Sequence, residues 1–411
     1  MRRHAGAILG IEPLLPLKIL ISAGEASGDW YAAQLTDAIR TLHPDAEFFG
    51  CAGPRMRAAG VRPIVDSASL AVVGLVEVLA HIPRIHGEFR KLKAAIDREQ
   101  PDLAILTDSP GFHFHLFKHL KKRRVPIVYM VAPQVWAWRK GRLKTLKAHV
   151  EHLLCIFPFE EEFFRSNGVA ATYIGHPLAH SIRPAVTQAE FFAKHKIPND
   201  RPLIALLPGS RAGEAARHLP PLAEAVGILQ RDRPMTIVAG TPLGFSQRAG
   251  ADFWKPFSGK AIQVLEGETW DLLAHSHLAL AASGTVTVEA ALLGCPMVTF
   301  YRVTTTSWAI GKLLVRVPYF SMVNLVAGKQ IVPELMQQQM SGPNVAREAL
   351  RLLDDEAARA DMKQELERVR LKLARPGSDL TSSADPISEA LSILGTLLKK
   401  KDYVAAAPSP E

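Results

Sequence analysis

The stretch L-I-A-L-L-P-G-S-R-A-G-E, Leu203 to Glu214, places five apolar residues before a small-residue loop and a helix start. An uninterrupted apolar run of this length predicts a strand covered on both faces, as in a parallel sheet. The same order recurs in K-I-L-I-S-A-G-E-A-S-G-D, Lys18 to Asp29, and in D-L-A-I-L-T-D-S-P-G, Asp102 to Gly111. Repeated strand, loop and helix units predict parallel sheets with helices on both faces.

The chain length predicts two domains. It has 411 residues, more than one hydrophobic core usually organises, and the pattern pauses between His180 and Pro202 before it restarts. We therefore expect two doubly wound, Rossmann-like α/β domains that face a cleft. The expected parts are an extension at 1–17, a first domain at 18–182, a second at 183–375, a helical segment at 376–402 and a disordered tail at 403–411. We expect the helical segment to pack back on the first domain or on a partner.

Shorter apolar runs extend this pattern. Further strands are expected at 127–131, 155–157, 172–174, 236–239, 263–265, 278–281 and 297–300. Helical spacing is found at 30–42, 214–230, 345–373 and 387–401.

The net charge of +9 favours an anionic partner. The first 180 residues hold 23 Lys and Arg against 17 Asp and Glu, so most of the excess lies there. A phosphorylated substrate, an acidic membrane surface and nucleic acid all fit this charge. Because no strand alternates aromatic residues with Gly, we do not expect an RNA-binding protein.

Cysteine spacing and hydropathy limit the remaining classes. The three cysteines, Cys51, Cys155 and Cys295, have no metal-site spacing, so we expect reduced thiols, no metal and no cofactor. Glu12 and Pro13 interrupt the apolar run near the N-terminus, which disfavours a signal peptide. Since no apolar stretch reaches about 18 residues, any membrane contact is expected to be peripheral.

The loop at Ser22 to Asp29 is a candidate binding loop. Its glycines, among them Gly28, permit a close turn, and Glu25, Ser27 and Asp29 supply polar contacts. The alternative is an ordinary turn with Ser27 or Asp29 as the helix cap.

The P-G-S-R loop is a candidate diphosphate site built from Gly209, Ser210 and Arg211. An Arg in the first turn of a helix opposes the macrodipole, which suggests an anion beside it. The alternative is a surface Arg paired with Glu214.

The loop A-S-G-T-V-T-V-E, residues 282–289, is a second candidate phosphate site. Ser283, Gly284 and Thr285 can cap a helix and hold phosphate. Capping does not explain Glu289, which lies in an apolar helix and can accept hydrogen bonds from ribose hydroxyls.

Asp108, in T-D-S-P-G-F, is the candidate general base. A carboxylate at the carboxyl end of a strand is well placed for proton transfer if its surroundings tune its pKa. From residue type alone, a helix-capping role is equally compatible.

Three further features are weaker candidates. His176 could contact phosphate or bond to its own loop, and Gln134 could meet sugar hydroxyls beside two Trp residues. The run at 70–79 could be a buried element or an apolar patch meeting lipid, with basic residues nearby. Its candidate membrane residues are Val72, Val73, Leu75, Val76 and Leu79.

Together these motifs resemble the lipid-A-disaccharide synthase family over residues 18–395. The resemblance rests on five motifs in order: S-A-G-E-A-S-G-D at 22–29, V-V-G-L-V-E-V-L at 72–79, V-W-A-W-R at 135–139, L-L-P-G-S-R at 206–211 and A-S-G-T at 282–285. The family implies a GT-B fold whose first half binds a lipid acceptor and whose second half binds the UDP of the donor. It implies inverting transfer of 2,3-diacylglucosamine from UDP-2,3-diacylglucosamine to 2,3-diacylglucosamine 1-phosphate, which yields a β-1,6-linked disaccharide 1-phosphate and UDP.

The resemblance also assigns roles and a location. Asp108 would be the base, and Arg211 with the loop at 283–285 would stabilise UDP without a metal. Asn324 matches a position near the donor, although S-M-V-N-L departs from the family's S-L-P-N. The enzyme would be cytoplasmic and peripheral to the inner membrane, and a homodimer is compatible with the family.

Two other functions stay open from the residues alone. A nucleotide-sugar epimerase of the same fold needs the same diphosphate loops, but it has no use for an apolar patch at 70–79. A non-catalytic membrane-binding module would explain that patch but not Arg211 and Glu289.

Overall fold

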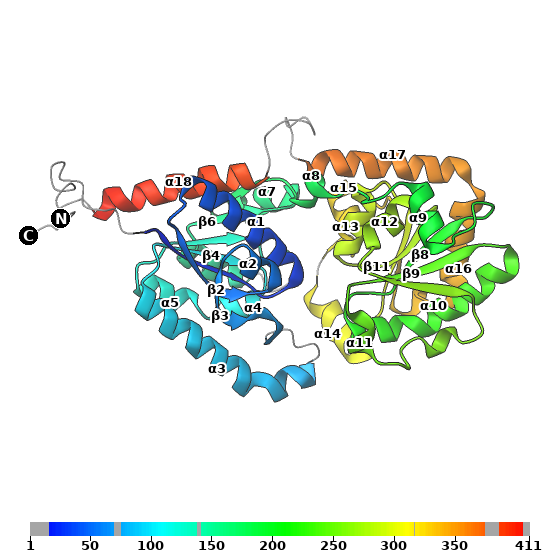
Figure 1. Cartoon of the computed structure of the whole chain (residues 1–411), viewed down its shortest axis with the longest axis horizontal. Coiled ribbons are helices and arrows are strands. Elements are labelled where there is room, and N and C mark those ends of the chain that lie inside the picture. Colours follow the sequence, from blue (N-terminus) through cyan, green and yellow to red (C-terminus); the bar gives the residue numbers. More distant parts are fainter. Residues whose placement is uncertain (1–15, 70–74, 138–140, 316, 375–385, 406–411) are drawn as a thin grey trace, which may run out of the picture.

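Two parallel sheets, each covered by helices, lie side by side in the computed structural model (Figure 1). The structure describes residues 16–69, 75–137, 141–315, 317–374 and 386–405. The first sheet has seven strands in the order β3-β2-β1-β4-β5-β6-β7, and the second has six in the order β10-β9-β8-β11-β12-β13. Two doubly wound parallel-sheet domains were expected, and the fold class is confirmed.

The first domain is the part built on the first sheet. Its strands are β1 (Lys18–Ala23), β2 (Glu47–Ala52), β3 (Arg62–Asp66), β4 (Leu103–Thr107), β5 (Ile127–Met130), β6 (His152–Cys155) and β7 (Ala171–Tyr173). Its helices are α1 (Ala26–Leu42), α2 (Pro54–Ala58), α3 (Leu75–Glu99), α4 (Pro110–His113), α5 (Phe117–Lys122), α6 (Arg142–His149) and α7 (Pro158–Ser166), and α18 (Pro386–Ala405) returns to it. Short helices α8 (Leu178–Ser181) and α9 (Gln188–His195) lead to the second domain.

The second domain is the part built on the second sheet. Its strands are β8 (Leu203–Leu207), β9 (Thr236–Thr241), β10 (Ile262–Glu266), β11 (Leu278–Ala282), β12 (Met297–Tyr301) and β13 (Glu334–Met336). Its helices are α10 (Ala212–Asp232), α11 (Phe245–Ala249), α12 (Thr269–His275), α13 (Thr285–Leu292), α14 (Thr305–Leu314), α15 (Met322–Ala327), α16 (Gly342–Asp354) and α17 (Glu356–Leu373).

The strand order reverses once in each sheet, between β1 and β4 and between β8 and β11. Ala23 pairs with Thr107 at the first reversal, and Leu207 pairs with Ala281 at the second. The four candidate loops therefore begin at the carboxyl ends of adjacent strands. Ligands of open α/β sheets bind at such switch points.

The core follows from the apolar runs. All five residues of β8 are at most 3% exposed, as a strand covered by helices on both faces requires. Each fully buried Leu or Ile side chain contributes about 1.5–3 kcal/mol.

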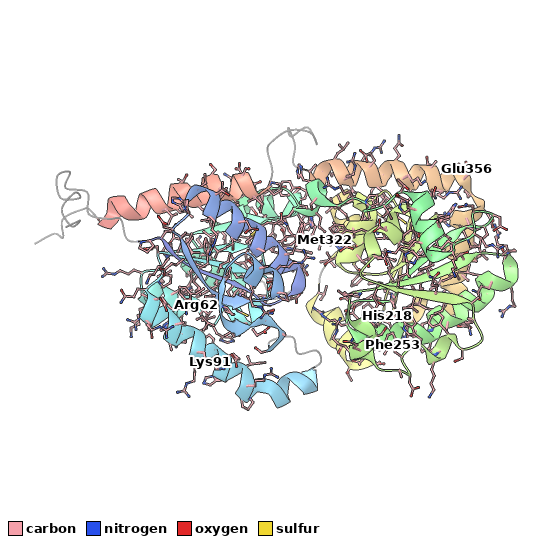
Figure 2. The ribbon with its side chains drawn as sticks, in the orientation of Figure 1. Arg62, Lys91, His218, Phe253, Met322 and Glu356 are labelled. Carbon is pink, nitrogen blue, oxygen red and sulfur yellow. The ribbon has the colours of Figure 1, made fainter. Side chains whose placement is uncertain are left out.

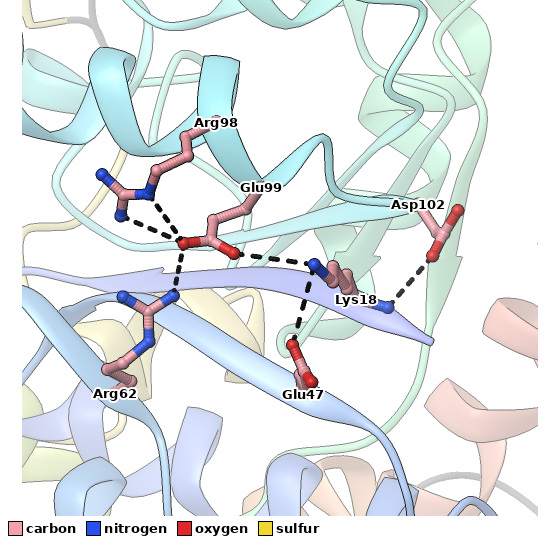
Figure 3. A network of polar contacts seen from close by, with 6 residues as sticks. All are labelled: Lys18, Glu47, Arg62, Arg98, Glu99 and Asp102. Carbon is pink, nitrogen blue, oxygen red and sulfur yellow. Dashed lines mark hydrogen bonds and ion pairs between the residues drawn. The ribbon is translucent and has the colours of Figure 1, made fainter. Parts of the chain in front are cut away.

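Charged residues begin the strands at the opposite end of the first sheet (Figure 3). Lys18 Nζ lies 3.7 Å from Glu99, which also pairs with Arg62 at 2.9 Å and Arg98 at 3.0 Å. The backbone N–H of Lys18 donates to Asp102 at 3.0 Å. These pairs lie at the amino ends of the strands. The candidate loops lie at the other, carboxyl ends.

Several predicted elements differ from the structure. The strand expected at 155–157 lies at His152–Cys155, because Phe157 already caps α7. The helix expected at 345–373 is two helices, since the Asp355 side chain accepts a hydrogen bond from Ala358 N–H and starts α17. β2, β3 and β13 were not predicted.

The last described helix packs on the first domain. α18 lies along α1, with Ile387, Ala390 and Leu394 buried (Figure 1). The end of α17 is bonded to the first domain as well, because Tyr173 Oη and His176 N–H donate to the carbonyls of Lys372 and Leu373. No helix in the described ranges has both the length and the apolarity needed to cross a membrane.

The predicted membrane patch lies partly outside the described residues. Val72 and Val73 fall there, as do residues 1–15 of the expected extension and residues 406–411 of the expected tail. Leu75, Val76 and Leu79 lie on α3, and their side chains are outside the description.

Candidate functional site

The candidate site is the space where the switch-point loops of the two sheets meet. Arg211 Nη2, in the loop after β8, lies 3.1 Å from Oε1 of Glu25, in the loop after β1. The ion pair joins the two domains. It also shows that the loop after β1 and the loop after β8 face each other.

Asp108 lies at the end of β4 with its carboxylate turned to the start of α1. Its Oδ1 accepts a hydrogen bond from Gly24 N–H at 2.9 Å, and its Oδ2 accepts one from Glu25 N–H at 3.2 Å. Asp108 and Ser109 have φ values of 51° and 39°, in the left-handed region that non-glycine residues seldom adopt. α1 begins at Ala26 rather than at the expected residue 30, and the Asp108 carboxylate binds the two N–H groups directly before it.

Two glycines make room for this carboxylate. A Cβ atom at residue 28 would lie 1.6 Å from Asp108 Oδ2, and one at residue 24 would lie 2.1 Å from Ser109 Oγ. Gly24 and Gly28 are therefore needed because Asp108 and Ser109 fill the space in front of them. The small residues of the loop after β1 thus make room for the carboxylate in the loop after β4.

The pKa of Asp108 is raised to about 7, mainly by burial and in smaller part by repulsion from the nearby Glu25 carboxylate. Hydrogen bonds from Gly24, Ser109 and Glu25 oppose this rise by favouring the charged form. A carboxylate that titrates near neutral pH is suited to accept a proton during a reaction.

Ser22, His113 and Asp108 form a cluster that resembles a hydrolase triad only in residue type. His113 Nε2 lies 2.8 Å from Ser22 Oγ, but Nδ1 lies 3.0 Å from the backbone carbonyl of Asp108 and not from its carboxylate. Ser22 and His113 are fully buried, and burial lowers the pKa of His113 to about 4. The neutral ring donates to the Asp108 carbonyl, as does Tyr129 Oη. The cluster therefore fixes the peptide that carries the carboxylate.

The other polar residues of the first loop take different places. Asp29 is buried, and its carboxylate accepts hydrogen bonds from Gly53, Arg55 and Met56 N–H at 2.8–3.2 Å, which caps α2. Ser27 is half-buried in the first turn of α1. Neither residue caps α1, whose N-cap is Glu25.

Gln134 is exposed in the loop after β5. The loop is anchored two residues later, where Trp136 Nε1 donates to Glu160 at 3.1 Å. Burial raises the pKa of Glu160 to about 8. His176 is buried at the junction of the domains, where its ring contacts Phe157.

The P-G-S-R loop presents Ser210 and Arg211 to solvent at the start of α10. Gly209 has a φ of 127°, which explains why glycine is needed there. The ion pair of Arg211 is with Glu25 rather than with Glu214, the alternative considered from sequence.

His218, on the buried face of α10, was missed by sequence reasoning (Figure 2). Its Nδ1 donates to the Pro208 carbonyl at 2.7 Å, and its Nε2 accepts from Arg302 N–H at 3.0 Å. The ring therefore ties the P-G-S-R loop to the end of β12. A histidine on the apolar face of a helix gives no sequence signal of such a role.

The loop after β11 starts α13 with exposed Gly284 and Thr285. Ser283 Oγ donates to the Phe320 carbonyl at 3.1 Å. Burial raises the pKa of Glu289 to about 7. The pKa of Tyr31, in the first domain, is raised by burial and, in smaller part, by the charge of Glu289. Glu289 therefore faces the junction of the domains.

Asn324 is fully buried on α15 and its amide is saturated. Nδ2 donates to Val332 O and Glu334 Oε1, while Oδ1 accepts from Ile331 and Val332 N–H, all within 3.0 Å. The structure thus gives Asn324 a supporting position in the second domain. In the described ranges, no three His, Cys, Asp or Glu side chains gather as a metal site would require.

Comparison with known proteins identifies close relatives. The family model described as lipid-A-disaccharide synthetase matches residues 19–384. The lipid-A-disaccharide synthase of Solibacter usitatus is 60% identical over 87% of this chain and 93% of its own length. That of Koribacter versatilis is 42% identical over 93% of this chain and 100% of its own length.

A solved structure supports the architecture. The UDP-GlcNAc 2-epimerase of Neisseria meningitidis, bound to UDP-GlcNAc, superposes with a TM-score of 0.59 at 13% identity, covering 92% of this chain and 100% of the epimerase. Likeness at this identity shows the fold alone.

Proposed function

Because this chain belongs to the lipid-A-disaccharide synthetase family, we propose that it joins its two acylated sugars in the space between Asp108 and Arg211. The enzyme is an inverting glycosyltransferase. It transfers 2,3-diacylglucosamine from UDP-2,3-diacylglucosamine to 2,3-diacylglucosamine 1-phosphate. The products are the β-1,6-linked disaccharide 1-phosphate and UDP.

The Asp108 carboxylate is the general base in this proposal. It takes the proton of the acceptor's 6-hydroxyl while that oxygen attacks the anomeric carbon of the donor, and the bond from this carbon to UDP breaks. A single displacement of this kind inverts the anomeric centre. The supporting observation is the fixed carboxylate at the first switch point, with a pKa of about 7.

The loops of the second domain hold the UDP. Negative charge develops on the diphosphate as the bond breaks, and the Arg211 guanidinium and the N–H groups at the starts of α10 and α13 can stabilise it. Gly209, Ser210 and the loop at 283–285 let the phosphates approach the backbone. Glu289 is assigned to the ribose hydroxyls.

The first domain takes the acceptor. Glu25, Ser27 and Gln134 are the polar residues assigned to it, whereas Asp29 and Asn324 support the loops from behind. The acylated substrates also require contact with the cytoplasmic face of the inner membrane. The segment at 72–79 and the cations along α3, such as exposed Lys91 (Figure 2), suit a peripheral contact with acidic lipid. A homodimer is part of the same proposal.

The test compares two substitutions of equal chemistry at the two ends of one strand, β4. Release of UDP from UDP-2,3-diacylglucosamine is measured with and without the acceptor, in detergent micelles. Asp108→Asn is expected to lose about 10²–10⁴-fold in kcat, the usual contribution of a general base. Asp102→Asn, at the amino end of β4, is the control and is expected to keep its rate.

Two results would contradict the assignment. Acceptor-independent release would favour a hydrolase or the epimerase that shares the fold. An Asp108→Asn enzyme within tenfold of the wild-type rate would remove Asp108 as the base.

A further inference from the structure

We propose that the Glu25 carboxylate, besides its assigned place near the acceptor, controls access of the donor's diphosphate to Arg211. In the empty enzyme this carboxylate forms an ion pair with Arg211, and the donor's diphosphate displaces the carboxylate from Arg211. The proposal rests on the proposed function, since it takes Arg211 as a ligand of the diphosphate. It adds an order of events, in which the donor binds first and the pKa of Asp108 then rises.

Glu25 contacts both halves of the site. Its backbone N–H donates to Asp108 Oδ2 at 3.2 Å, whereas its side-chain Oε1 lies 3.1 Å from Arg211 Nη2. The residue is the N-cap of α1, and its side chain makes no capping hydrogen bond, so the side chain can leave Arg211 without disturbing the start of the helix. A change at Arg211 therefore acts on a residue that is in direct contact with the base.

The ion pair is of a kind that a ligand can exchange. The side chains of Glu25 and Arg211 are 52% and 48% exposed, and pairs at such exposure are weak. A carboxylate and a phosphate present the same oxygen acceptors to a guanidinium fork. The diphosphate carries more charge and can also bind the N–H groups of the loops, so it displaces the carboxylate.

The exchange has a consequence at the base. The Glu25 carboxylate already raises the pKa of Asp108 by repulsion. When the donor takes Arg211, Glu25 loses its neighbouring cation and the repulsion grows. The pKa of Asp108 is then higher in the donor complex than in the empty enzyme, so its carboxylate is a stronger base when the leaving group is present.

The test is a double-mutant cycle on UDP binding, measured by calorimetry without acceptor. The four proteins are wild type, Glu25→Gln, Arg211→Gln and the double variant, and uridine is the matched ligand without a diphosphate. Glu25→Gln is expected to tighten UDP binding about two- to fivefold when Arg211 is present, the range set by an exposed ion pair. The gain is expected to be smaller without Arg211 and absent for uridine.

The outcomes separate this proposal from the proposed function. Equal gains in both backgrounds would mean that Glu25 only repels the diphosphate, and the proposal would be overturned. A gain with uridine, or none with UDP, would also overturn it, while the Asp108 experiment would stand. A wild-type enzyme that does not bind UDP would overturn the donor site and this proposal together.

Discussion

Replacing Gly28 by Ala should displace the base without touching its chemistry. The added methyl carbon would lie 1.6 Å from Asp108 Oδ2 and 2.6 Å from its Cγ. Ordinary van der Waals contact begins at 3.4 Å, so the carboxylate has to move by about 1.8 Å. A displacement of about 1 Å at a reacting group costs about 10²-fold. We therefore expect kcat to fall at least 10²-fold.

The assay is acceptor-dependent UDP release, with thermal unfolding measured on the same samples. Ala favours a helix over Gly by up to about 1 kcal/mol, so helix propensity predicts no loss of stability in α1. Gly111→Ala is the matched control, because a Cβ there meets nothing within 4 Å although the residue lies three positions from Asp108. A Gly28→Ala enzyme within threefold of wild type, or an equal loss in Gly111→Ala, would refute the steric argument.

Four further predictions test the same structure. In the wild type, kcat/KM should rise with pH through about 7, because only the ionised Asp108 accepts a proton; a flat profile from pH 6 to 8 would contradict this. His113→Ala should move that profile and lower kcat about tenfold, whereas His113→Gln should restore it because an amide N–H can reach the Asp108 carbonyl; unchanged profiles would leave His113 a structural residue only. In urea unfolding, Glu160→Gln should stabilise the protein by about 3–5 kcal/mol above pH 8 and should not stabilise it below pH 4.5. The reason is that burial raises the pKa of the Glu160 carboxyl, so its ionisation destabilises the folded state as the pH rises. Equal stability of variant and wild type at pH 9 would exclude this. Asn324→Ala should cost about 2–4 kcal/mol of unfolding free energy, because the N–H groups of Ile331 and Val332 lose their acceptor; a loss below about 1 kcal/mol would show that water replaces the amide.

Local pattern predicted the elements that are uniformly apolar. β8 lies where the run at 203–207 placed it, because a strand buried on both faces needs apolar residues at each position. β3 was missed because it is an edge strand with Arg62, Pro63 and Asp66 exposed or partly exposed, and such a segment has no apolar run. β13 has only three residues, too few for any periodicity.

The candidate loops were predictable, but their division of labour was not. Small residues after apolar strands marked both switch points. That Gly28 serves Asp108, and that Asp29 caps α2, depends on distances between segments far apart in the chain. The pairing of Arg211 with Glu25 depends in the same way on how the two domains face each other. No local pattern contains this information.

The position of α18 sets a schedule for biosynthesis. The first domain needs Ile387, Ala390 and Leu394 to cover α1, but a ribosome makes these residues only after the whole second domain. At 5–20 residues per second, the roughly 200 intervening residues take about 10–40 s. During that time the nascent first domain exposes an apolar helix face to solvent. The first domain therefore gains its last covering helix only when α18 leaves the exit tunnel.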